Sequence, residues 1–172
     1  MENTKLHEIV ITAIVVKPSR PDDGLGGEGK FLITRRSAAK KRFPLMWTVP
    51  GGRLETADYI NLPKDTKEYW YNVLEKTVRR EVKEETGLDI SDVEYVTSLA
   101  TVHADGTPSL VISCMAKYAG GDIVFQEGES VEAAWVNLEE ARGYDLIDGI
   151  YDELAMANER LLGKKSEWKR AN

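Results

Sequence analysis

The sequence predicts an α/β fold in which a mixed β-sheet is packed between helices. Apolar runs of strand length occur in both halves of the chain, at residues 9–16 and 110–115. A long amphipathic helical pattern lies between them, and a second helical pattern closes the chain. Each such element has an apolar face that must be covered, and elements that follow one another in this way pack as layers.

The N-terminal half begins with two predicted strands. Residues 8–17 are almost continuously apolar, which is typical of a strand buried on both faces. Glycine and proline recur through residues 18–30, so a loop is expected there. Residues 31–34 form the second strand, and Arg35 and Arg36 follow it. These arginines are either surface charges or candidates for phosphate contacts at the rim of a site.

A basic loop and a glycine pair come next. The loop carries Lys40, Lys41 and Arg42, and it leads into the stretch 46–55, which contains Pro50-Gly51-Gly52-Arg53. Glycine allows a ligand or metal to approach the backbone closely. Taken alone, this stretch would be interpreted as a plain hairpin turn.

The central helix is predicted to start near Asp65 and to end at Gly87. Asp65 and Glu68 have the spacing of a capping box, and Gly87 suits the left-handed position that follows a helix. At about 100° per residue, one apolar stripe is expected, comprising Trp70, Leu74 and Val78.

Three carboxylates continue this stripe near the end of the helix. Glu81, Glu84 and Glu85 are spaced i, i+3 and i+4, so they share one face. A solvated charged face is the ordinary interpretation of such a group, but these side chains point where core residues point. Burying several carboxylates together is unfavourable unless a cation compensates them. Oxygen ligands suit Mg²⁺ or Mn²⁺, so the pattern predicts a divalent-metal site.

The second half of the chain supplies more strands and the closing helix. Strands are expected over residues 93–102 and 108–118, joined by a hairpin at Asp105-Gly106. His103 is expected to be a solvated turn residue rather than a catalytic one. An acidic loop with Glu129 and Glu132 precedes a strand, residues 138–141 start a helical turn, and a final helix is expected over 146–162.

Composition limits the classes of protein that this chain can belong to. The length of 172 residues fits one domain, and the net charge of −6 argues against binding long nucleic acid. We expect no membrane span, because the apolar run at 9–16 is too short. The single Cys114 excludes an intrachain disulfide and predicts a cytoplasmic protein, in which this thiol is buried in a strand.

The glycine pair and the helix motif together resemble the Nudix box. The family pattern is Gly, five residues, Glu, seven residues, then Arg-Glu-apolar-x-Glu-Glu-x-Gly-apolar. The residues from Arg80 to Leu88 match its second half at every defined position. The first half departs, because the box is lengthened by an insertion expected around residues 56–67. Counting forward from Gly52 places Asp58 at the first glutamate of the box, and counting back from Arg80 places Asn72 there. Glu55 or Asp58 could substitute for that glutamate.

This resemblance implies a fold and a chemistry. The fold is a single Nudix-type α/β/α sandwich over residues 1–172, with its core at about 9–162. The chemistry is hydrolysis of a diphosphate bond with Mg²⁺ or Mn²⁺. The metal site would comprise Gly52, Glu81, Glu84, Glu85 and Glu129. Arg80 would orient a carboxylate, and Glu85 or Glu129 would accept the proton of the attacking water. The candidate substrate contacts are Arg35, Arg36 and Arg53, and Glu132 is the second choice after Glu129.

Several alternatives remain at this stage. Nucleoside triphosphates, ADP-ribose-like compounds, sugar nucleotides and dinucleotide polyphosphates are all candidate small-molecule substrates. The altered first half of the box also suits a nucleotide or nucleotide-sugar sensor that does not turn its ligand over. The insertion is either a lid over the substrate or a contact in a homodimer.

Overall fold

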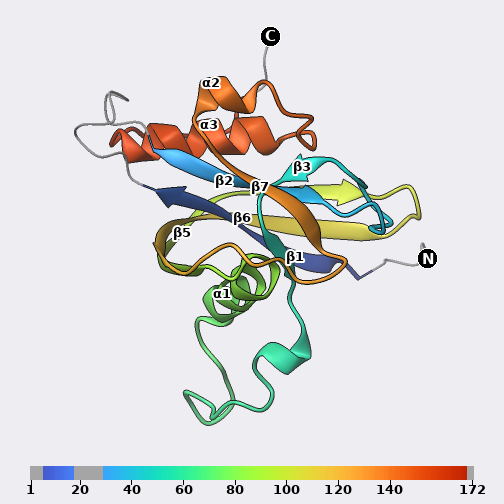
Figure 1. The fold of residues 1–172 in the computed structure, drawn as a ribbon. Helices are drawn as coiled ribbons and strands as arrows, with labels where there is room; N and C mark the ends of the chain where they lie inside the picture. Colours follow the sequence, from blue (N-terminus) through green and yellow to red (C-terminus); the bar gives the residue numbers. More distant parts are fainter. Residues whose placement is uncertain (1–5, 18–28, 170–172) are drawn as a thin grey trace.

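The computed structural model describes residues 6–17 and 29–169, and it shows a mixed sheet with helices on both faces (Figure 1). The sheet has seven strands in the order β3-β2-β1-β6-β5, with β4 paired to β1 and β7 paired to β2. β1 and β6 run parallel, whereas the other described pairs are antiparallel. The predicted mixed sheet is therefore confirmed. The strands are β1 (Glu8–Lys17), β2 (Lys30–Arg36), β3 (Trp47–Thr48), β4 (Gly51–Arg53), β5 (Asp89–Val102), β6 (Pro108–Gly120) and β7 (Ser130–Val136).

Two separate apolar cores lie on the two faces of the sheet. Helix α1 (Val73–Thr86) covers one face, and helices α2 (Leu138–Ala141) and α3 (Ile150–Leu161) cover the other (Figure 1). Strand β1 serves both cores because successive side chains alternate between faces. Ile14 and Val16 pack toward α3, whereas Ile11, Ala13 and Val15 pack toward α1.

The central helix starts later than the sequence predicted. Helix α1 begins at Val73, not near Asp65, because Asp65 closes a local turn instead: its Oδ2 accepts a hydrogen bond from the Tyr71 amide at 2.9 Å. Asn72, which precedes the helix, is left-handed with φ of 54°. Trp70 therefore lies outside the helix, and its indole donates to the Leu62 carbonyl at 2.9 Å.

The helix ends as predicted, with Gly87 left-handed at φ of 75° and its amide bonded to the Lys83 carbonyl. The predicted apolar stripe of this helix is partly wrong, because only Val78 of its three members is buried on the helix. Leu74 is 38% exposed, whereas Val78 and Val82 are completely buried against the sheet.

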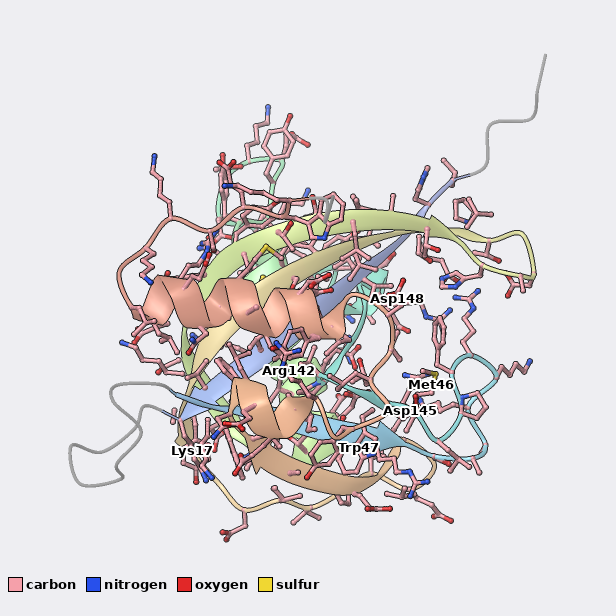
Figure 2. All side chains as sticks on the ribbon, turned by 90° about the horizontal axis from the view of Figure 1, so that it is seen from above. Lys17, Met46, Trp47, Arg142, Asp145 and Asp148 are labelled. Carbon is pink, nitrogen blue, oxygen red and sulfur yellow. The ribbon has the colours of Figure 1, made fainter. Side chains whose placement is uncertain are left out.

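The final helix also starts later than expected, at Ile150 rather than Leu146. The segment before it is tied to β3: the Trp47 amide donates to the Asp145 carbonyl, and the Ile147 amide donates to the Trp47 carbonyl, both at 2.8 Å. Figure 2 shows Trp47, Asp145 and Asp148 along this junction, at the entrance to α3. The junction fixes where α3 begins beside the sheet.

The first strand and the hairpin between β5 and β6 lie where the sequence predicts them. Strand β1 has the predicted bounds, and the hairpin between β5 and β6 turns at Asp105-Gly106 as expected. The loop predicted over 18–30 lies mostly outside the described residues. No helix of the described chain combines the length and the apolarity that crossing a membrane requires.

Candidate active site

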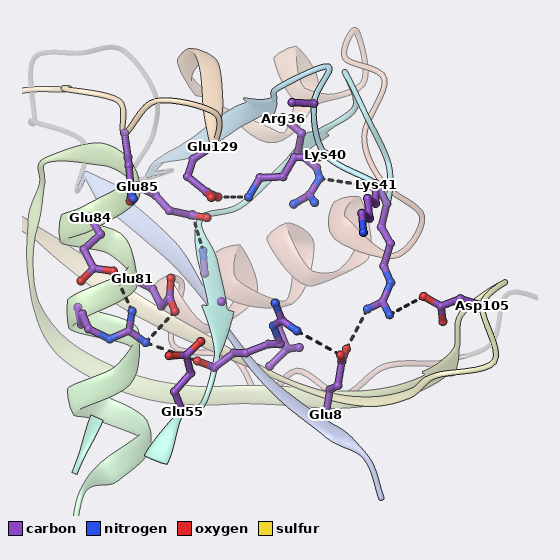
Figure 3. A pocket seen from close by; sticks show the side chains of 18 residues that line it. Glu8, Arg36, Lys40, Lys41, Glu55, Glu81, Glu84, Glu85, Asp105 and Glu129 are labelled. Carbon is purple, nitrogen blue, oxygen red and sulfur yellow. Dashed lines mark hydrogen bonds and ion pairs between the residues drawn. The ribbon is translucent and has the colours of Figure 1, made fainter. Parts of the chain in front are cut away.

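A cavity of about 840 Å³ lies between the second half of α1 and the loop that follows β2 (Figure 3). Its remaining walls come from β4, the start of β1, the hairpin turn at Asp105 and the loop before β7. Most of the predicted site residues line it: Arg36, Gly52, Arg53, Arg80, Glu81, Glu84, Glu85 and Glu129. Segments distant in sequence are thus gathered at one site.

The carboxylates of α1 occupy different environments. The Glu81 side chain is 14% exposed, whereas that of Glu84 is 49% exposed and lies at the solvent edge. Glu85 is partly buried, and its Oε2 accepts a hydrogen bond from the Gly51 amide at 3.0 Å. The sequence placed all three carboxylates on the core-facing side, but only Glu81 and Glu85 turn inward.

Burial raises the pKa of both inward carboxyls. The pKa of Glu85 rises to about 7, chiefly through burial; the Gly51 amide opposes the shift, and the charges of Glu129 and Glu81 add to it. Burial also raises the pKa of Glu81, although Arg80 opposes this. The mutual influence of these acids indicates that they face a common space, where added positive charge would be favourable.

Arg80 links the helix carboxylates to the loop after β4. Its guanidinium reaches Asp58 at 2.5 Å, and Glu81 and Glu84 at 2.8 Å each. Asp58 lies in the 3₁₀ turn η1 (Thr56–Asp58), and its side chain is 3% exposed. It also accepts hydrogen bonds from the Thr77 hydroxyl and the Glu55 amide, each at 2.9 Å.

These contacts distinguish among the three residues considered for the first glutamate of the box, because only one of them pairs with Arg80. Burial disfavours ionisation of Asp58, but the hydrogen bonds from Arg80, the Glu55 amide and Thr77 outweigh it and lower its pKa. Asp58, not Glu55 or Asn72, therefore occupies the position that pairs with Arg80. The loop that follows Asp58 runs over residues 59–72 to the start of α1 and includes most of the residues 56–67 at which an insertion is expected.

Cationic side chains form the wall opposite α1. Arg36, Lys40, Lys41 and Arg42 line the cavity from β2 and the loop after it. Lys40 pairs with Glu129, which lies beside it on the loop before β7, next to the end of β2 (Figure 3). Burial lowers the pKa of Arg36, and the negative charges of Glu85 and Glu129 oppose this shift.

Glu8 holds two further cations at the far end of the cavity. Its carboxylate contacts Arg42 at 2.9 Å and Arg53 at 3.3 Å, and Arg42 also reaches Asp105 at 2.9 Å (Figure 3). Ser109 donates a hydrogen bond to the same carboxylate at 3.2 Å. The guanidinium groups are therefore fixed beside the cavity rather than free in solvent.

Gly52 leaves room for the Glu81 carboxylate. A Cβ atom at this position would lie 2.3 Å from Glu81 Cδ, so any side chain would displace the acid. Glu81, Glu85 and Glu129 offer the hard oxygen donors that Mg²⁺ and Mn²⁺ prefer, and the residues fit such an ion chemically. Among the described residues, no three acidic side chains converge closely enough to hold one ion, because Arg80, Lys40 and the Gly51 amide hold these carboxylates.

Some singled-out residues lie away from this cavity. Arg35 pairs with Glu132 at 2.6 Å, and neither residue lines the cavity. His103 is partly buried rather than simply solvated, since its Nε2 lies 2.9 Å from the Ser109 hydroxyl. Cys114 is buried as expected, and burial raises the pKa of its thiol.

Sequence reasoning also missed parts of the site. The sequence predicts a basic loop at Lys40, Lys41 and Arg42 but does not place these residues in the cavity. A run of cations directly after a strand could have indicated a site for an anion. Glu8 gave no signal, because a single acid at the start of a strand is ordinary. Only the pairing of β1 with β4 and β6 brings Glu8 to this cavity.

Comparisons with known proteins agree with the motif. A family model of the NUDIX domain matches residues 22–154. The NAD-capped RNA hydrolase NudC of Deinococcus radiodurans is 34% identical over 131 residues, covering 76% of this chain and 39% of NudC. Escherichia coli K12 NudC is 42% identical over 62 residues, covering 36% of this chain and 23% of NudC. This chain thus spans less than half the length of these relatives.

Solved structures show the same fold. The NUDIX domain of Shewanella oneidensis NrtR, complexed with ADP ribose, superposes with a TM-score of 0.67 at 19% identity over 92% of this chain and 90% of that domain. The MutT protein from Methanosarcina mazei gives a TM-score of 0.62 at 24% identity over 91% of this chain and 96% of its own.

Proposed function

Since this chain belongs to the Nudix family, we propose that it is a divalent-metal-dependent hydrolase of a diphosphate bond in a nucleotide-linked substrate. The observation that carries the proposal is the cavity in which the α1 carboxylates face a cationic wall. A diphosphate needs cations around its oxygens, and its hydrolysis needs a group that accepts the proton of water. Both kinds of group line the same space here.

The cationic wall is suited to hold the diphosphate. Arg36 is partly buried between β2 and the cavity, so its position is restricted before any ligand arrives. Lys40 already pairs with the neighbouring Glu129, and phosphate oxygens would offer it an alternative partner. Arg42 and Arg53, held by Glu8, extend the positive charge toward the hairpin turn.

Glu85 is the proposed proton acceptor. The Gly51 amide fixes its orientation, and partial burial makes its carboxylate more basic than an exposed one. Glu129, held by Lys40, is the second choice. Arg80 would hold Glu81 and Glu84 in place until the metal binds, since it bridges both to the buried Asp58.

A divalent cation, Mg²⁺ or Mn²⁺, would be held by Glu81, Glu84, Glu85 and Glu129 beside Gly52. When bound, such a cation neutralises charge on diphosphate oxygens and favours ionisation of a nearby water. Binding requires Glu81 and Glu84 to exchange contacts with Arg80, and Glu129 to exchange its contact with Lys40. The side chain of Arg80 would keep its bond to Asp58 during this exchange.

The substrate class is proposed from chemistry that two comparison proteins share. One is named as a hydrolase of NAD-capped RNA, and the other is complexed with ADP ribose. NAD contains an ADP-ribose unit, so both molecules present a diphosphate that joins adenosine to a second ribose. We therefore place ADP-ribose and dinucleotides such as NAD first, ahead of nucleoside triphosphates, sugar nucleotides and dinucleotide polyphosphates.

A sensor that binds nucleotides without hydrolysis is the second candidate. It is favoured by the ion pairs that Arg80 and Lys40 form with the proposed metal ligands. Glu85 argues against it, because a binding site for an anion has no need of a partly buried, oriented carboxylate facing its ligand.

The test is phosphate release, coupled to a phosphatase, from ADP-ribose, NAD, ATP, a sugar nucleotide and diadenosine tetraphosphate. Turnover with Mg²⁺ or Mn²⁺ that EDTA abolishes is expected. Glu85→Gln should lower kcat by roughly 100-fold or more, whereas Glu139→Gln, an exposed acid on α2, should leave it unchanged. Turnover insensitive to EDTA or to Glu85→Gln would refute the proposal. Thermal stabilisation by a nucleotide without any turnover would favour the sensor.

A further inference from the structure

A second cavity, of about 520 Å³, adjoins the first. The two share lining residues, among them Val10, Arg36, Gly51 and Glu85, so a ligand could extend from one into the other. The second cavity lies on the α3 side, where Ile147 and Ile150 contribute to it from the junction tied to β3.

Charge is distributed unevenly along this second cavity. Among the described residues that line it, Arg36 and Arg42 are the only arginine or lysine residues, and both also line the first cavity. Beyond them the walls are largely apolar, with Val49, Leu99 and Val111 among the lining residues. An anionic group is therefore favoured where the cavities meet, and an uncharged, flat group is favoured deeper in.

Four buried polar atoms of the described residues in this region lack hydrogen-bond partners. They are the hydroxyls of Thr12, Thr34 and Ser113, and Glu153 Oε2. Glu153 is 5% exposed, and Glu153 and Thr12 both line the second cavity. Ser113 pairs in register with Thr12 across β1 and β6.

A ligand could supply hydrogen-bond partners to these atoms, because buried polar atoms in proteins are nearly always paired. Burial raises the pKa of Glu153, and the nearby Ser113 hydroxyl opposes this shift. The hydroxyl and the carboxyl do not, however, meet the geometry of a hydrogen bond. An unpaired buried carboxyl is destabilising on its own, and a ligand that hydrogen-bonds to it removes that cost.

We propose that the second cavity binds the nucleobase of the substrate, and that Glu153 and Thr12 recognise a ring edge with an amino group beside a ring nitrogen. The inference rests on the proposed function, since the attached diphosphate would lie in the first cavity. The amino group donates to Glu153, and the apolar walls cover the ring faces. A carbonyl in place of that amino group would face Glu153 without a hydrogen to donate, so such bases are disfavoured.

The test is calorimetric binding of AMP, GMP and IMP, in the presence of Mg²⁺, to the wild-type chain and three variants. IMP is the purine of this set without an amino group. Wild type should bind AMP or GMP roughly tenfold more tightly than IMP, the effect of one satisfied hydrogen bond to a buried group. Glu153→Leu should abolish this preference. Glu153→Gln should keep much of it for AMP, because an amide retains a donor and an acceptor.

Controls separate recognition from folding. Glu159→Gln changes an exposed acid on the same helix and should leave the preference intact. Thr12→Val, nearly the same in shape, should reduce the preference less than Glu153→Leu. Melting curves establish that each variant is folded, and Glu153→Leu should melt no lower than wild type because it removes an unpaired buried carboxyl.

Two results would overturn this inference. One is equal binding of the three nucleotides by folded wild type, or no binding of any. The other is an unchanged preference in Glu153→Leu, which would mean that Glu153 pairs with buried water only. Binding does not depend on turnover, so a base preference that depends on Glu153 in a chain without hydrolase activity would support this inference while refuting the proposed hydrolase.

Discussion

Glu85 gives the metal-free protein a dependence of stability on pH that can be worked out in advance. Its pKa rises from 4.5 to about 7 in the folded chain, first because of burial. The folded state then holds the proton more tightly than the unfolded state does. The contribution to stability is complete below the unfolded pKa and is lost as pH rises toward the folded pKa. At about 1.4 kcal/mol per pKa unit, the loss between pH 5 and pH 8 is about 2.5 kcal/mol.

Glu85→Gln isolates this contribution. The glutamine oxygen can still accept the hydrogen bond from Gly51, but the side chain no longer ionises. Relative to wild type, the variant should therefore gain about 2.5 kcal/mol of unfolding free energy between pH 5 and pH 8. Differences of packing between the two side chains are the same at both pH values and cancel in this comparison.

The assay is urea unfolding in EDTA at pH 5, 6, 7 and 8, followed by circular dichroism. EDTA is essential because a bound cation would stabilise the ionised carboxylate and hide the effect. Glu139→Gln, at an exposed position, should track wild type at every pH. A stability difference between Glu85→Gln and wild type that is flat over this range, or that moves in the opposite direction, would refute the raised pKa of Glu85.

Three further results are expected. Asp58→Asn should lower the unfolding free energy by about 2 kcal/mol, since it weakens a nearly buried partner of Arg80; urea unfolding showing no loss would contradict the role given to Asp58. Gly52→Ala should reduce turnover at least roughly tenfold and weaken Mn²⁺ binding, because a Cβ would displace the Glu81 carboxylate; titration calorimetry with unchanged Mn²⁺ affinity would be incompatible with this. Mg²⁺ or Mn²⁺ at a hundredfold excess over Kd should stabilise the fold by about 2.7 kcal/mol and so raise the melting temperature. An unchanged melting temperature would argue against a metal site.

The fold was largely predictable because its signals are local. The apolar run of β1, the Asp105-Gly106 turn and the left-handed Gly87 each follow from neighbouring residues. The start of α1 was not predictable from the same reasoning. Asp65 and Glu68 have capping-box spacing, but the loop satisfies Asp65 through the Tyr71 amide and leaves the helix to begin after Asn72.

Only part of the candidate site could be predicted from the sequence. The glutamates of α1 follow from helical spacing, and Gly52 followed from the family pattern. The cations opposite them depend on how the loop after β2 folds over the cavity, and Glu8 depends on strand pairing between distant segments. Glu153 looks like an ordinary helix acid in sequence, since only packing of α3 on the sheet buries it. The spacing of residues along the sequence does not reveal non-local contacts of this kind.

The position of Asp58 has a consequence for how this chain can vary. The ion pair between Asp58 and Arg80 joins the segment before residues 59–72 to the helix after them, so this contact closes the loop whatever its length. Lengthening such a loop costs little, about 0.6 kcal/mol per doubling. The stretch between Tyr59 and Asn72 is thus a place where the chain can change in length and sequence without moving the residues that line the first cavity.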